Sequence, residues 1–161
     1  MKNERKLLIV IIFCFCIFIY SYNKGNLQKE IYMKEADLYL DSQMIMYLAG
    51  NGKEAIKKLE ILKDKYPNNY VFQIDMGYCY MLEGKYEQAQ VEFEKALKQR
   101  QSLINKSSFL YKYGKTLYEN GDYTKSKYIL KKAKSIGFNG KNKEYQIYTE
   151  EILKNIKLGE K

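Results

Sequence analysis

Two carboxylates, Asp41 and Asp75, are the residues of this chain whose types and spacing come closest to catalytic chemistry. They occupy matching places one sequence repeat apart, so stacked repeats could bring them face to face as an acid and a base. The sequence around them offers no further group that would tune their pKa values or complete a metal site. We therefore interpret them as a solvated pair.

Other routes to catalysis are also poorly supported. The 161 residues contain no histidine, which removes the commonest general base, the usual catalytic triads and most transition-metal sites. Residues 49–53 contain Gly and Lys but lack the spacing of a phosphate-binding loop. Cys79 is the only cysteine after residue 23, and its apolar surroundings predict a small buried hydrophobic residue. We expect no enzyme activity, no catalytic residues, no cofactor and no metal.

The elements that position these residues are repeated. Glycines at 50, 84 and 121 lie 34 and 37 residues apart, and each precedes a small residue by five positions and a bulky apolar residue by nine. Repeats of this period are typical of stacked helical hairpins, which work as binding surfaces. Apolar residues recur at helical spacing between the glycine-containing turns, and no alternating strand pattern is present. Gly77 and Gly114 further predict places where two helices approach closely.

The repeats resemble tetratricopeptide repeats (TPRs) from about Ala36 to Phe138. The central copy carries the resemblance at Met76, Gly77, Tyr80, Gly84, Tyr86, Ala89, Phe93 and Ala96. The third copy keeps the pattern after a longer loop, whereas the first departs from it at Ser42, Gln43 and Leu62. We expect an all-α fold, a right-handed helical-hairpin solenoid of about three TPR-like repeats, in residues 36–69, 70–106 and 107–140. A C-terminal capping helix in residues 141–161 would complete it.

The resemblance also implies a ligand groove. In the TPR family the first helix of each hairpin lines the concave side of the superhelix, and ligand peptides lie across it. Carried over to this sequence, that face comprises Leu40, Asp41, Met44, Tyr47, Ile74, Asp75, Tyr78, Met81, Tyr111, Lys112, Lys115 and Tyr118. Tyr and Met suit an adaptable protein-binding surface. The alternative is that some of these residues are core or cap contacts.

These features predict a scaffold or adaptor for protein–protein interaction. Its partner would be a protein or peptide segment. The acidic end of the groove at Asp41 and Asp75 and the basic end at Lys112 and Lys115 suggest a partner that is apolar in the middle and oppositely charged at its ends.

Charge is unevenly distributed and supports an alternative function. From Asn23 to Ala96 there are 12 acidic and 10 basic residues, whereas 15 basic and 6 acidic residues follow from Leu97 to Lys161. A predicted basic patch comprises Lys125, Lys127, Lys131, Lys132, Lys134, Lys141 and Lys143. It could attract anionic lipid, wall polymer or an acidic protein. Nucleic acid is not expected, because Arg is nearly absent. The bland alternative is a solubilising lysine-rich face.

The N-terminus predicts a membrane segment. Lys2, Arg5 and Lys6 precede an uncharged stretch from Leu7 to Asn23, which as a helix spans roughly 26 Å against about 30 Å of bilayer core. We expect residues 1–23 to be a hydrophobic anchor helix, with membrane contact through residues 7–22, and residues 24–35 to be a linker and the start of the first helix. A cleaved signal peptide or a buried helix is the alternative.

The distribution of basic residues predicts the orientation of this segment. The N-terminus would stay in the cytoplasm and the repeats would face the outside of a bacterial membrane. Signal cleavage would instead give a secreted protein.

Overall fold

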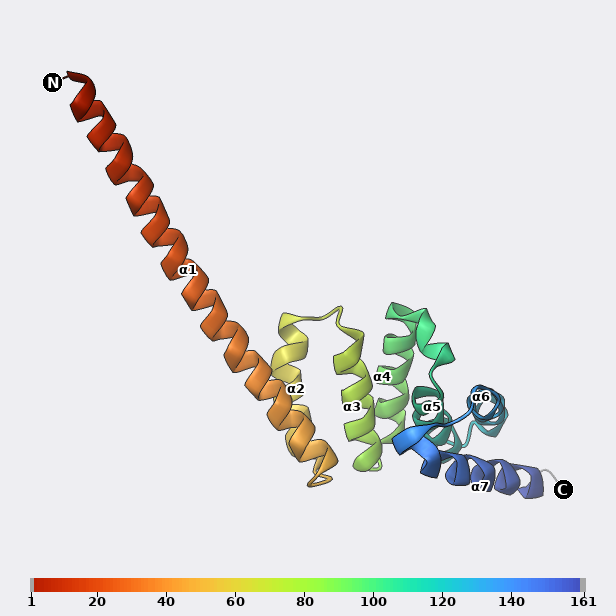
Figure 1. Ribbon diagram of the computed structural model, residues 1–161. Coiled ribbons are helices and arrows are strands. Elements are labelled where there is room, and N and C mark those ends of the chain that lie inside the picture. The colour runs from red at the N-terminus through yellow and green to blue at the C-terminus, as the bar shows by residue number, and fades with distance from the viewer. Residues whose placement is uncertain (1, 160–161) are drawn as a thin grey trace. The chain divides into compact units, whose positions relative to one another are not determined.

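The regular elements of this chain are helices. The computed structural model describes the backbone of residues 2–159 and the side chains of residues 12–140 and 142–159, and no strand occurs in this part of the chain (Figure 1). The helices are α1 (Lys2–Tyr47), α2 (Gly52–Lys65), α3 (Tyr70–Leu82), α4 (Tyr86–Gln99), α5 (Ser107–Glu119), α6 (Tyr123–Ile136) and α7 (Lys143–Gly159), with short 3₁₀ helices at Gln101–Asn105 and Gly140–Asn142. The prediction of an all-α fold is confirmed for the described residues.

The chain divides into two units, Met1–Leu40 and Asp41–Lys161, which we describe separately. The first unit belongs to α1. Residues 24–35, which we predicted as a linker and the start of the first helix, are helical throughout. The predicted N-terminal hydrophobic helix is therefore only the beginning of a longer helix that becomes polar and charged after Ser21.

The predicted single-pass membrane location is wrong. No helix among the described residues is both long enough and apolar enough to cross a membrane. The physical reason is length, because even in the full sequence the apolar run from Leu7 to Tyr20 is shorter than the roughly 20 residues that a span requires. The side chains of residues 7–11 of the predicted anchor, and those of Lys2, Arg5 and Lys6, lie outside the described residues. The orientation inferred from their charge is withdrawn with the location.

In the second unit, the end of α1 and α2 form the first hairpin, α3 and α4 the second, and α5 and α6 the third. Each later hairpin turns through a glycine with a left-handed backbone, Gly84 at φ 68° and Gly121 at φ 81°, a conformation that side chains disfavour. Asn69 and Asp122 accept hydrogen bonds from the amides of Val71 and Lys125 and so begin α3 and α6. Local sequence thus determines where each helix begins and ends.

Two glycines bring the helices of a hairpin together. A Cβ atom placed on Gly77 of α3 would lie 2.8 Å from the ring of Phe93 on α4, and one on Gly114 of α5 would lie 2.6 Å from Leu130 on α6. Both distances are too short for real atoms. The bulky side chain of the second helix therefore lies directly on the backbone of the first, as the repeat pattern predicted.

The core follows the stack from one hairpin to the next. Its largest described cluster joins α4, α5 and α6 through Ala89, Phe93, Ala96, Leu103, Phe109, Leu110, Tyr113, Leu117, Ile129 and Ala133. Within it, Phe93 meets Phe109 edge to face with ring centroids 5.8 Å apart. A further cluster joins α5 and α6 to α7 through Tyr111, Leu130, Ile152 and Ile156. Helix α7 thus continues the stack beyond the third hairpin.

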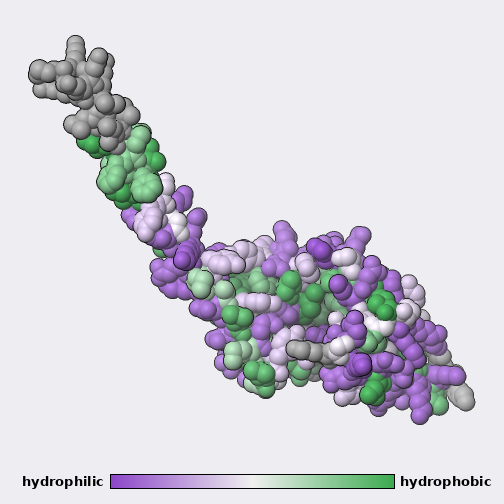
Figure 2. Space-filling model, in the orientation of Figure 1, coloured by the Kyte–Doolittle hydropathy of each residue, from purple (hydrophilic) through white to green (hydrophobic). Residues whose placement is uncertain are grey.

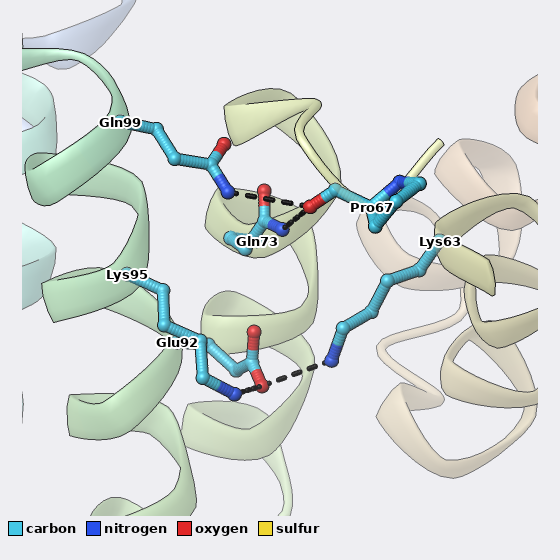
Figure 3. Close-up of polar contacts among 6 residues, drawn as sticks. All are labelled: Lys63, Pro67, Gln73, Glu92, Lys95 and Gln99. Carbon is cyan, nitrogen blue, oxygen red and sulfur yellow. Dashed lines mark hydrogen bonds and ion pairs between the residues drawn. The ribbon is translucent and has the colours of Figure 1, made fainter. Parts of the chain in front are cut away.

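Polar contacts tie the first hairpin to the second (Figure 3). Glu92 of α4 is buried and accepts from Lys63 of α2 at 3.1 Å and from Lys95 at 2.9 Å. Gln73 of α3 donates to the carbonyl of Pro67 at 3.0 Å, in the loop that follows α2. Because buried polar groups require partners, these contacts restrict how α2 sits against α3 and α4.

The close contact at Gly114 gives a test of hairpin packing. We expect Gly114→Ala to lower the free energy of unfolding by about 1–3 kcal/mol, because the new methyl group must displace Leu130. Urea denaturation followed by circular dichroism measures this. Gly25→Ala in α1 is the matched control, since its Cβ would meet nothing within 4 Å. A loss of stability no larger at Gly114 than at Gly25 would contradict the packing described.

Candidate functional site

The centre of the predicted groove is a lysine held between aromatic rings. Tyr47, at the end of α1, stacks on Tyr78 of α3 with ring centroids 5.4 Å apart. The ammonium group of Lys112 on α5 lies 3.9 Å from the centroid of the Tyr78 ring and 5.4 Å from that of Tyr47. It also donates to the Tyr47 hydroxyl at 3.4 Å. The three residues come from three successive hairpins and are joined by cation–π attraction.

The charge of this lysine is largely removed from solvent. Lys112 is only 8% exposed, and burial lowers its pKa while the negative charge of Asp75 opposes that shift. Asp75 is 5% exposed and accepts a hydrogen bond from Gln43 at 2.8 Å. Asp75 and Lys112, which we predicted at opposite ends of the groove, therefore interact with each other. Little of their charge is available to a partner.

Helix α7 brings further tyrosines to this face. Tyr145 stacks on Tyr111 of α5 with ring centroids 4.3 Å apart and planes 16° from parallel, and Tyr148 lies beside the same ring at 6.4 Å. Burial raises the pKa of Tyr111, and the neighbouring phenol of Tyr145 adds to the effect. The rings of α1, α3, α5 and α7 thus line one continuous face of the stack.

A hollow opens where this face meets α7. It encloses about 220 Å³ and is lined by Tyr111, Lys115, Tyr118, Glu119, Tyr148, Glu151, Ile152 and Asn155. Three of these residues, Tyr111, Lys115 and Tyr118, belong to the predicted groove. The hollow combines aromatic walls with one basic and two acidic side chains, and its volume accommodates a side chain rather than a whole small ligand.

The other predicted groove residues are distributed differently. Ile74 and Met81 are partly buried and pack against the core between α4 and α6, so they do not line the hollow. Leu40 and Met44 are exposed on α1, at 59% and 58%. Asp41 forms an exposed ion pair with Lys58 at 3.3 Å. Asp41 is exposed, whereas Asp75 is buried and accepts from Gln43, so the prediction of a solvated pair is wrong for Asp75.

The predicted basic patch is partly neutralised. Lys125 pairs with Glu94 at 2.8 Å, and Lys134 pairs with Glu150 at 2.9 Å. Lys127, Lys131 and Lys132 lie along α6, Lys143 is exposed at the start of α7, and the side chain of Lys141 lies outside the described residues. Lys127 and Lys131 adjoin Lys154 and Lys157 of α7.

Sequence analysis missed the contribution of α7 to both surfaces. Tyr145 and Tyr148 lie in the predicted capping helix of residues 141–161, and their rings extend the groove face along α5. Lys154 and Lys157 were not grouped with the lysines of α6. Their spacing on α7 was visible, but only the packing of α7 on α5 and α6 shows which residues they meet.

Cys79 is fully buried, as predicted. Burial, followed by the charge of Asp75, raises the pKa of its thiol to about 12. The thiol therefore stays protonated at neutral pH and fills space beside the groove face.

Comparisons with known proteins place the fold. No protein-family model and no curated protein matches the sequence. Solved structures do, among them the Yersinia enterocolitica type III secretion chaperone SycD in complex with a peptide of the translocator YopD, at TM-score 0.64 and 20% identity over 78% of this chain and 94% of that one. Pseudomonas aeruginosa PcrH matches at TM-score 0.60 and 20% identity over 77% and 92% of the two chains.

The Sgt2 TPR domain from Aspergillus fumigatus matches at TM-score 0.61 and 16% identity, over 78% of each chain. At these identities the likeness concerns the fold. The second unit is a TPR-like helical repeat, and the predicted TPR-like architecture is confirmed at that level.

The tyrosines of this face predict how stability depends on pH. Burial raises the pKa values of Tyr47, Tyr78, Tyr111 and Tyr145 above their ordinary value of 10.0. The folded chain therefore holds these protons more tightly than the unfolded chain, and the free energy of unfolding falls as the pH rises above about 10. Lys112 has the opposite sign, because its lowered pKa makes the folded state less stable while the lysine is protonated.

At alkaline pH, the destabilising contribution of the four tyrosines to the free energy of unfolding should exceed the stabilising contribution of Lys112. We expect Tyr111→Phe to raise the pH midpoint of alkaline unfolding, because the stacked ring is kept and the titrating hydroxyl is absent. One pH unit above the ordinary tyrosine pKa, the free energy of unfolding of the variant should exceed that of the unchanged chain by about 1 kcal/mol. Circular dichroism against pH measures the midpoint. Tyr128→Phe is the control, since Tyr128 is exposed on α6. Equal midpoints for both variants would contradict this account.

Proposed function

We propose that this chain binds an extended segment of a partner protein along the face formed by α3, α5 and α7, as a scaffold or adaptor without enzyme activity. The hollow between α5 and α7 carries the proposal, because it is a concave, aromatic-lined place next to exposed polar groups. Two of the similar structures are complexes with part of another protein: SycD with a peptide of YopD, and PcrH with the chaperone binding region of PopD.

The surface chemistry supports a segment anchored by one or two side chains. On the face seen in Figure 2, hydrophilic residues cover most of the repeat unit and apolar residues form small separate patches. A partner that relied on a broad apolar area would find little of it there. An aromatic or aliphatic side chain can enter the hollow, while its flanking groups reach Lys115, Glu119 and Glu151 at the rim.

The charge pattern of the partner differs from the one that the sequence suggested. Asp75 and Lys112 are buried, and Asp41 is paired with Lys58, so three of the four charges expected to select the ends of a partner are already engaged within the chain. Lys115 is the remaining member of that set at the hollow. We infer that the partner carries charged groups of both signs near its anchoring side chain, to match Lys115, Glu119 and Glu151, and needs no complementary cation for Asp41 or Asp75.

A binding role without catalysis fits the titratable groups of this face. The pKa of the Cys79 thiol is about 12, and the pKa values of the neighbouring tyrosines are raised. None of these groups exchanges a proton near neutral pH, so they make poor nucleophiles and poor general bases. Their rings and sulfur atom instead serve as packing for the face.

Peptide selection tests the proposal. A random peptide library is selected against the whole chain, and the dissociation constants of the recovered peptides are measured for the unchanged chain and for Tyr148→Ala. We expect Tyr148→Ala to weaken binding about tenfold or more, as for an aromatic residue at an interface. Tyr128→Ala removes an equally large exposed ring from α6 and should leave the affinity unchanged. Failure to recover peptides, or peptides indifferent to Tyr148, would overturn the proposal.

A further inference from the structure

A second hollow lies between α6 and α7. It encloses about 530 Å³, within the usual range of ligand sites, and is lined by Lys127, Lys131, Leu153, Lys154 and Lys157. None of these residues lines the hollow between α5 and α7. The two surfaces can therefore be altered independently, and a role for this second hollow does not rest on the proposed groove function.

The lysines of this hollow concentrate positive charge. Lys127 and Lys131 are four residues apart on α6, and Lys154 and Lys157 are three apart on α7, so each pair shares a helix face. Like charges at these spacings repel each other, and the two pairs also adjoin across the hollow. No carboxylate lines it in the described part of the chain.

Two other lysines of α6 are paired with carboxylates. Lys125 and Lys134 form ion pairs with Glu94 and Glu150, which neutralise their charge locally. Lys131, Lys154 and Lys157 are exposed, and each makes no ion pair among the described residues. Three lysines without an ion-pair partner among the described residues therefore lie together around this hollow.

The lining also contains an apolar surface. Leu153 is half-buried between the lysines, and the stems of Lys154 and Lys157 extend that surface because lysine carries a long aliphatic chain below its ammonium group. A ligand that complements the whole hollow must therefore combine several negative charges with one apolar group. A simple polyanion would satisfy the rim and leave Leu153 uncovered.

We propose that the hollow between α6 and α7 binds an acidic peptide segment of a partner protein, in which an apolar side chain packs on Leu153 and flanking carboxylates meet Lys131, Lys154 and Lys157. Charge complementarity selects this occupant over an apolar one. Concavity selects it over a membrane surface, because a planar array of headgroups reaches the rim but does not enter the hollow. Binding also relieves the repulsion among the lysines.

Fluorescence anisotropy of a labelled peptide tests the proposal on the whole chain. The probe is a synthetic peptide with one leucine flanked on each side by three glutamates, and it is compared with a peptide in which glutamine replaces every glutamate. We expect the acidic peptide to bind, the glutamine peptide not to bind, and the affinity to fall as salt is raised. A third peptide, with alanine in place of leucine, should bind more weakly because Leu153 loses its contact.

Charge variants locate the binding. We expect the triple variant Lys131→Gln, Lys154→Gln and Lys157→Gln to weaken binding of the acidic peptide about tenfold or more, since three exposed charge pairs are lost together. The matched control is the variant Lys57→Gln, Lys98→Gln and Lys106→Gln, which removes the same net charge from exposed positions elsewhere. It should retain nearly the full affinity. Circular dichroism confirms that both variants are folded.

Several results would overturn the proposal. Equal weakening by the two triple variants would mean that net charge and not the hollow attracts the peptide. Equal affinity for the leucine and alanine peptides would remove the role of Leu153. Self-association of the unchanged chain that the hollow variant abolishes would identify a second copy as the occupant. Binding to anionic lipid vesicles through the same lysines, without peptide binding, would identify a membrane. Tyr148→Ala should leave the peptide affinity unchanged, which separates this site from the proposed groove.

Discussion

The contact between a glycine on the first helix of a hairpin and a bulky side chain on the second is the constraint on which the repeat unit depends. At Gly77 and Gly114 the partner side chains, Phe93 and Leu130, lie where a Cβ atom would otherwise stand. Helices can approach this closely only where one side chain is absent, and their separation in turn determines the spacing of the next hairpin. The register that brings the rings of α1 and α3 to Lys112 follows from it.

In that register, much of the charge on the groove face is buried or paired within the chain. Lys112 is enclosed by the rings of Tyr47 and Tyr78, and the negative charge of Asp75 acts on it. Burying a lone ammonium group costs free energy, and aromatic faces with a nearby carboxylate recover part of that cost. A contact that stabilises the stack and a contact that selects a ligand are therefore alternatives for the same residue. Here the buried positions of the groove face serve the stack, and the residues around the α5–α7 hollow stay accessible.

The sequence was sufficient for features that depend on local conformation or on a repeated pattern, such as the positive φ at Gly84 and the close contact at Gly77. The linker expected at residues 24–35 is helical instead, because a polar sequence without proline can extend a helix as readily as it can end one. Non-local packing was beyond such reasoning. Ile74 and Met81 share the sequence register of the groove, yet they pack against the core. Helix α7 does not carry the repeat pattern, so its contacts could not be inferred from the other copies.

Helix α7 is consequently the element that differentiates this unit from a plain array of hairpins. One face of it carries Tyr148 and Ile152 against α5, and another carries Leu153 and Lys157 beside α6. Between two hairpins of a repeat array these surfaces would be covered by the next repeat, whereas beside α7 both are partly open. The chemistry of the two hollows differs because the helices opposite α7 differ, since α5 presents aromatic rings and α6 presents lysines. Docking one terminal helix on two unlike neighbours is thus enough to create two unlike surfaces within a single repeat unit.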